Sequence, residues 1–204
     1  MRTLAALALA ALAAAPAADP GRLEAGPADG SLRVHVAKRG AFSMFAHDHD
    51  FEVTRWSATA RLPEGDPARA AIEVVLSAGS LRDRQRKLSD ADRRKVDAQA
   101  AGPEVLDAGK FPEITWRAER ATLDAGGEGG QVRGTLHGEL TVRGRTRPVD
   151  AAFEAARQGG GWTVRGKARF PQSAFGIRPF RGFGGTVGVK DEVEVSFAFT
   201  LRPR

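Results

Sequence analysis

Residues 134–148 read GTLHGELTVRGRTRP, and this stretch decides the fold class. Residues 134–143 alternate strictly between small or apolar side chains and polar ones, a period of two that predicts a half-buried β-strand. The apolar face comprises Gly134, Leu136, Gly138, Leu140 and Val142. Residues 143–147 form a polar turn, and Pro148 then stands at the start of the next strand, a position that tolerates proline.

Similar alternation recurs along the chain and predicts eight strands in all. They are Ser31–Lys38, Phe51–Leu62, Ala70–Leu81, a strand beginning at Phe111, Val132–Arg143, Pro148–Ala156, Trp162–Phe170 and Asp191–Leu201. The alternation slips at residues 54–56, which predicts a bulge or a bend. Ser89, followed by Asp90 and Asp92, predicts the start of a helix on the barrel surface.

Eight strands, mostly linked as hairpins and with one helical insert, predict an all-β fold. We expect an eight-stranded antiparallel β-barrel, with a two-sheet sandwich as the competitor. Closure into a barrel removes exposed strand edges, which favours the barrel. The interior of such a barrel either packs against itself or holds one small ligand.

The composition narrows the function classes. The chain of 204 residues is long enough for one domain, and it has no cysteine, which excludes disulfides, thiolate catalysis and cysteine-bound zinc. A net charge of +6 makes nucleic acid and an anionic membrane candidate partners. The arginines are scattered and no nucleic-acid-binding motif accompanies them, so we expect a solvated exterior and no nucleic-acid partner; peripheral contact with a membrane surface stays open.

The N-terminus predicts export. Met1 and Arg2 form a short positive region, residues 4–15 are apolar, and small residues precede Asp19. This is the pattern of a secretory signal peptide over residues 1–18. We therefore expect a leader over residues 19–30, a barrel domain over residues 31–204, and a periplasmic or secreted protein.

Four segments occur in order along the chain: FSMFAHDHDF (42–51), DAGKFPEITW (107–116), GELTVRGRTRPV (138–149) and VKDEVEVSFAFTL (189–201). With them, residues 31–201 resemble the YceI-like family of exported bacterial lipid-binding proteins. The resemblance implies a lipocalin-like barrel of eight antiparallel strands. It also implies an isoprenoid-type lipid, either a polyprenyl or a quinone-like molecule, held in an apolar tunnel.

Inward-facing apolar residues are the candidate tunnel wall. They are Phe45, Phe51, Trp116, Leu136, Leu140, Phe153, Val164, Phe175, Val195 and Phe197. Gly134, Gly138, Gly166 and Ala168 share these faces, and we interpret them as leaving space for a slender chain. Phe175 belongs to the long connection over residues 171–187, which is expected to cap the tunnel.

His47 and His49 stand two residues apart and fall on one side of an extended chain. Together with Arg178 and Lys190 they are candidates for a polar rim that meets the lipid headgroup. Two imidazoles at this spacing also suit a transition metal if another part of the chain supplies a third ligand. The alternative function is therefore metal binding in the periplasm through His47 and His49. A purely structural role for both histidines stays open as well.

Signatures of catalysis are absent from the sequence. It contains no Gly-x-Ser-x-Gly motif, phosphate-binding loop or dinucleotide fingerprint. We therefore expect a non-enzymatic binding protein without a cofactor, either a monomer or a homodimer, that sequesters or transports its lipid.

Overall fold

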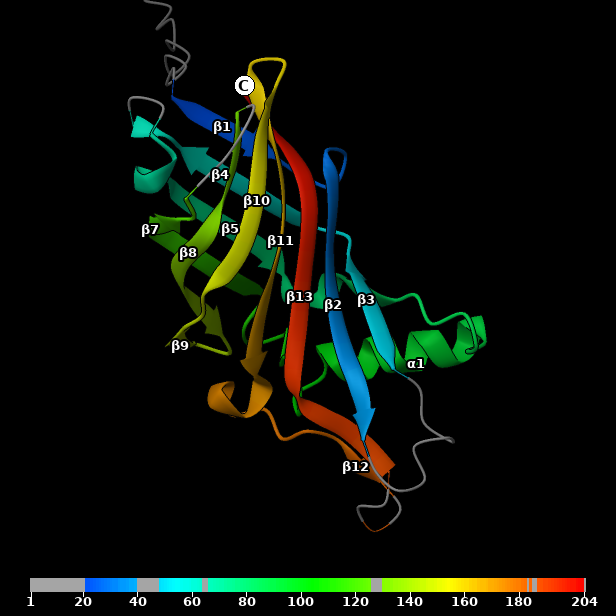
Figure 1. Ribbon diagram of the computed structural model, residues 1–204. Coiled ribbons are helices and arrows are strands. Elements are labelled where there is room, and N and C mark those ends of the chain that lie inside the picture. The colour runs from blue at the N-terminus through cyan, green and yellow to red at the C-terminus, as the bar shows by residue number, and fades with distance from the viewer. Residues whose placement is uncertain are drawn as a thin grey trace, which may run out of the picture.

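The computed structural model describes residues 21–39, 48–63, 66–125, 130–182, 184 and 187–203 (Figure 1). The predicted signal peptide, Phe45 and His47 lie outside the described residues.

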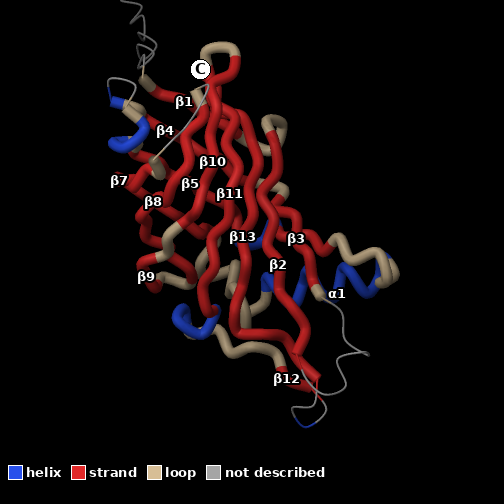
Figure 2. Tube along the Cα trace, in the orientation of Figure 1, coloured by secondary structure: helices blue, strands red, loops and turns tan. Residues whose placement is uncertain are grey.

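Strands dominate the described chain (Figure 2). They are β1 (Arg22–Ala25), β2 (Gly30–Arg39), β3 (His49–Val53), β4 (Trp56–Arg61), β5 (Ala71–Ser77), β6 (Leu81–Asp83), β7 (Glu113–Leu123), β8 (Gln131–Val142), β9 (Arg145–Pro148), β10 (Ala151–Gln158), β11 (Gly161–Pro171), β12 (Arg181–Gly182) and β13 (Val187–Pro203). The α-helix α1 spans Asp90–Ala101, and 3₁₀ turns span Pro67–Arg69, Ala78–Ser80 and Gln172–Phe175.

Eight strands form a closed antiparallel ring in the order β1-β4-β5-β7-β8-β10-β11-β13. The ring closes where Leu23 and Glu24 of β1 pair with Pro203 and Arg202 of β13. The prediction of an eight-stranded antiparallel barrel is therefore confirmed. Closure leaves β1 and β13 paired with each other instead of exposed as free edges.

A second set of strands extends the barrel wall on one side. The 17-residue β13 also pairs with β2, and β3 and β6 follow in the same sheet. Between β3 and β4 the chain bends, and both the backbone N–H and the hydroxyl of Thr54 donate to the Ser80 carbonyl, at 3.0 and 2.9 Å. This bend accounts for the slip in alternation at residues 54–56.

The helix α1 lies next to β6, beyond the edge of that second set (Figure 1). Its N-cap is Ser89, whose side chain accepts a hydrogen bond from the Asp92 N–H at 3.1 Å. Capping of this kind satisfies one of the free N–H groups of the first turn. The predicted helix start at Ser89 is thus present.

The eight strands of the ring are not the eight predicted ones, because β2, predicted over Ser31–Lys38, lies outside the ring and β1 completes it. Strand β1 lies inside the predicted leader; with only four residues, of which Leu23 and Ala25 are buried, it is too short to show a period. The predicted strand at Pro148–Ala156 is divided, because β9 ends at Pro148 and β10 begins at Ala151. A tight turn precedes β9, with φ of 50° at Arg143 and 68° at Gly144, the left-handed pair that two-residue hairpins favour.

The inner face of β8 is buried as its alternation predicts. Its glycines, however, do not leave open space. A Cβ at Gly138 would lie 2.4 Å from the Trp116 ring, and one at Gly134 would lie 2.1 Å from the Thr122 carbonyl oxygen. On β11, a Cβ at Gly166 would lie 2.4 Å from the Phe197 ring. The interpretation of these glycines as tunnel space is wrong, because neighbouring rings and backbone already occupy it.

Much of the positive charge on the exterior is paired across strands. The Glu194 carboxylate accepts from Lys167 at 2.9 Å and from Arg169 at 2.5 Å. Glu154 accepts from Arg165 at 2.5 Å in the same way. Hydrogen bonds from Lys167 and Arg169 hold the pKa of Glu194 below its ordinary value.

Candidate ligand cavity

The barrel encloses a cavity of about 340 Å³, a volume within the range of roughly 300–1,000 Å³ that is usual for small-ligand pockets. Every ring strand except β1 contributes to its wall, and so do β2, β3, β6, α1 and the connection after β11. Among the described residues, the polar members of the lining are His49, Gln99, Gln172 and Arg178. An apolar wall of this kind suits a hydrocarbon chain, because it offers little to hydrogen-bond.

Eight of the ten predicted tunnel residues line this cavity. They are Phe51, Trp116, Leu136, Leu140, Val164, Phe175, Val195 and Phe197. Phe153 does not; it is buried in a separate apolar cluster with Ala118, Ala121 and Ala151. Phe45 lies outside the described residues.

Trp116 and Phe197 line the cavity and also pack against that second cluster, and two members of the cluster, Leu136 and Ala151, line the cavity as well. The Trp116 ring is fixed by its Nε1–H, which donates to the Val149 carbonyl at 2.9 Å. This part of the cavity wall therefore rests on packed aromatic rings and on the second cluster.

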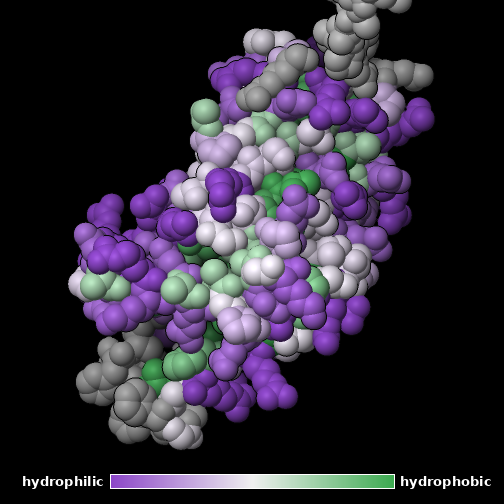
Figure 3. Space-filling view, turned by 180° about the vertical axis from the view of Figure 1, so that it is seen from behind, coloured by the Kyte–Doolittle hydropathy of each residue, from purple (hydrophilic) through white to green (hydrophobic). Residues whose placement is uncertain are grey.

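The cavity reaches the surface at the segment between β11 and β12. Arg178 and Phe180 line the cavity there and are exposed to solvent, Phe180 by 52%. In Figure 3 hydrophobic atoms are visible at this lower end within a largely polar surface. Lys190 is exposed and does not line the cavity; its carbonyl accepts a hydrogen bond from the Gln172 side chain at 2.8 Å.

The helix α1 contributes part of the wall, through Val96 and Ala100, and the turn after it contributes Val105 and Leu106. Sequence reasoning placed this helix on the surface and missed its part in the cavity. The signal was present as an apolar stripe, because residues 96 and 100 lie four apart on one helix face.

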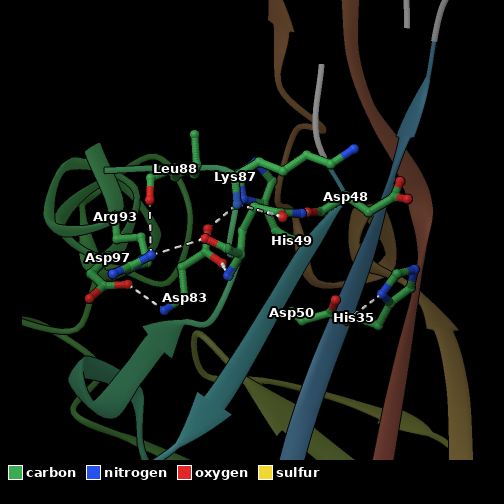
Figure 4. Close-up of polar contacts among 10 residues, drawn as sticks. His35, Asp48, His49, Asp50, Asp83, Lys87, Leu88, Arg93 and Asp97 are labelled. Carbon is green, nitrogen blue, oxygen red and sulfur yellow. Dashed lines mark hydrogen bonds and ion pairs between the residues drawn. The ribbon is translucent and has the colours of Figure 1, made fainter. Parts of the chain in front are cut away.

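His49 lies in the cavity wall, paired with a buried carboxylate (Figure 4). Its Nδ1 lies 2.6 Å from Oδ2 of Asp83, whose side chain has 0% exposure. The imidazole also stacks on Phe51, with ring centroids 5.9 Å apart. Because side chains alternate along β3, the neighbouring Asp50 points outward, and its Oδ1 lies 2.6 Å from Nδ1 of His35.

Metal binding stays a prediction. Among the residues that the structure describes, no group of three or more histidine, aspartate or glutamate side chains is arranged to hold a metal ion. His47, the second imidazole of the proposed pair, lies outside them.

A hydroxyl, an imidazole and a carboxylate do meet on the outer face of the barrel, which sequence reasoning did not single out. His137 Nε2 lies 2.8 Å from the Thr122 hydroxyl, and its Nδ1 lies 3.0 Å from Asp150. Hydrolytic triads have this order of groups. These three residues do not line the cavity, and Thr122 and Asp150 are exposed.

None of the helices in the described chain is both long and apolar enough to cross a bilayer.

Comparison with solved structures shows the same fold. BcnA of Burkholderia cenocepacia aligns with a TM-score of 0.60 and 20% identity, over 83% of this chain and 95% of that one. A polyisoprenoid binding domain from Saccharophagus degradans aligns with a TM-score of 0.62 and 10% identity, over 90% and 99%. The YceI protein of Campylobacter jejuni aligns with a TM-score of 0.51 and 13% identity, over 71% and 79%.

No curated protein matches the chain. The family model of the YceI-like domain matches residues 27–201, which cover the barrel ring from β4 to Leu201 of β13 and leave out β1. The chain belongs to the YceI-like family.

Proposed function

We propose that this protein is an exported, non-enzymatic binding protein that holds an isoprenoid-type lipid in its barrel for sequestration or transport. The observation that supports this most directly is the cavity, whose described wall consists mainly of apolar side chains. The similar Saccharophagus degradans protein is a polyisoprenoid binding domain, which agrees with this proposal.

The energetics favour a chain-like ligand. Each buried CH₂ contributes about 0.8 kcal/mol, so one five-carbon isoprenoid unit contributes on the order of 4 kcal/mol before the cost of ordering the chain. A few units in the cavity therefore suffice for stable binding, even with few polar contacts.

Residues 1–18 have the pattern of a signal peptide, and we propose that the protein is exported to the periplasm or secreted. Mass measurement of protein recovered from the periplasm and the medium tests this. Cleavage near Ala18 or Asp19 supports export, and an uncleaved chain retained in the cytoplasm contradicts it.

Native mass spectrometry of the freshly purified protein, followed by solvent extraction, tests lipid binding and reports the oligomeric state in the same spectrum. We expect a bound mass that extracts as an isoprenoid-type lipid. A protein that purifies empty and takes up no added prenyl chain would overturn the proposal.

A further inference from the structure

The position of His49 in the cavity wall leaves one polar atom available to a ligand. Its Nδ1 is occupied by Asp83, and among the described residues its Nε2 has no hydrogen-bond partner. No buried side-chain nitrogen or oxygen in the described chain lacks a partner, so Nε2 is accessible. The side chain of His49 is 21% exposed, and the residue lines the cavity.

Asp83 fixes how that nitrogen is presented. Besides His49, its carboxylate accepts the Gln85 N–H at 2.8 Å, while its own backbone N–H donates to Asp97 at 2.7 Å. A buried carboxylate bound on both oxygens keeps the imidazole proton on Nδ1 and holds the ring in one orientation. Nε2 then accepts from a hydroxyl when the ring is neutral, and donates to a carbonyl when the ring is protonated.

The surroundings of Nε2 suit an uncharged head. Val36, which pairs with His49 across the β2–β3 ladder, and Phe51 line the cavity beside it, and both are apolar. A phosphate needs several donors to offset its desolvation, and it would meet one nitrogen here with a carboxylate directly behind it. Arg178, the one cation among the described lining residues, belongs to the exposed segment between β11 and β12.

We infer that His49, positioned by Asp83, binds the polar head of the cavity ligand, and that this head is an uncharged hydroxyl or carbonyl group, as in a prenol or a quinone. The inference rests on the proposed function and adds the class of head group. Lipids with a phosphate head bind less well at this position.

The chain offers a matched control. The His35–Asp50 pair has the same 2.6 Å separation, and its side chains are 42% and 57% exposed. His49→Gln keeps a donor for the buried Asp83 but removes the distal ring nitrogen. His35→Gln makes the same change in the exposed pair.

The experiment measures the affinity of the wild type and both variants for four probes with one tail length: geranylgeraniol, the menaquinone with that tail, geranylgeranyl phosphate, and the head-free hydrocarbon. We expect the wild type to prefer the alcohol and the quinone over the hydrocarbon and the phosphate. His49→Gln should weaken alcohol and quinone binding by about two- to tenfold, the loss of one hydrogen bond, and leave hydrocarbon binding unchanged. His35→Gln should change nothing.

Equal losses for the hydrocarbon would show that His49 only shapes the cavity, and tightest binding of the phosphate would contradict the uncharged head; either result overturns the inference but not the proposed function. If no probe binds the wild type, the proposed function itself fails. Circular dichroism checks that each variant folds. If His49→Gln does not fold, Asp83→Asn, which leaves the ring in place, serves as the second variant and should reduce the preference for the alcohol over the hydrocarbon.

Discussion

The ring of Trp116 lies directly over Gly138 of the neighbouring strand, so that a Cβ at that glycine would be 2.4 Å from the indole. The same ring donates from Nε1 to the Val149 carbonyl, 2.9 Å away. The missing side chain on β8 is therefore the reason why a large aromatic ring can lie across the inner face of the barrel and form part of the cavity wall.

Replacing this glycine should displace the ring. We expect Gly138→Ala to lower the free energy of unfolding by about 1–3 kcal/mol, because the added methyl group overpacks a filled site. Urea denaturation measures the loss, and tryptophan fluorescence reports the displaced indole. Gly109→Ala is the control, since nothing lies within 4 Å of a Cβ at that position; equal effects from both changes would contradict the prediction.

A larger side chain in the cavity should reduce the length of prenyl chain that the barrel binds without changing its outer surface. Ala168 lines the cavity on β11, and we expect Ala168→Phe to lower the affinity for long prenyl chains more than for short ones, because the new ring shortens the space for the tail. Native mass spectrometry with a series of prenols measures this. Ala152→Phe, on the exposed face of β10, should bind the whole series as the wild type does.

Glu194 should stabilise the barrel more at neutral pH than in acid. Lys167 and Arg169 depress the pKa of this carboxyl, so its contribution is present above the unfolded-state pKa of about 4.3 and is lost as the pH falls through the lower folded-state pKa. Glu194→Gln should thus cost about 1 kcal/mol at pH ~7, and the difference should be smaller at pH ~3.

Thermal unfolding at both pH values measures this difference for Glu194→Gln. Glu119→Gln, at an exposed position that forms no ion pair within the described chain, provides the comparison. A loss that is equally large in acid would show that packing and not charge is responsible.

The N-cap of α1 should control how readily that part of the cavity wall opens. Ser89→Ala removes the hydrogen bond to the Asp92 N–H and should destabilise the helix by about 1 kcal/mol. Hydrogen exchange should then quicken in residues 90–101 and not in β8. Ser89→Asp, which restores a capping oxygen, should return the exchange to the wild-type rate; exchange that stays slow in the alanine variant would contradict the role of the cap.

The alternation of side chains was enough to predict the barrel, because each strand of the ring except β1 is long enough to show its period. It also predicted most of the cavity wall, since inward positions on different strands share one interior. The four residues of β1 contain too few repeats to show a pattern.

Other features depend on contacts that a linear pattern does not contain. The space beside Gly138 is filled by a ring from another strand, so composition alone suggested a void where the structure has none. Asp83 pairs with His49 across 34 residues, and in the charged run around it nothing distinguishes a buried carboxylate from a solvated one.

The part of the wall formed by α1 differs from the rest in how it is attached. Strands of the ring are joined by ladders, in which a change of length in one strand disturbs the register of two neighbours. The helix is joined to β6 through the side chain of Asp97, which accepts from the Asp83 N–H. We therefore expect insertions, deletions or a different helix within residues 88–110 to alter the volume and ligand selectivity of the cavity while the sheet stays intact. This segment is the place to change when ligand preference is to be engineered.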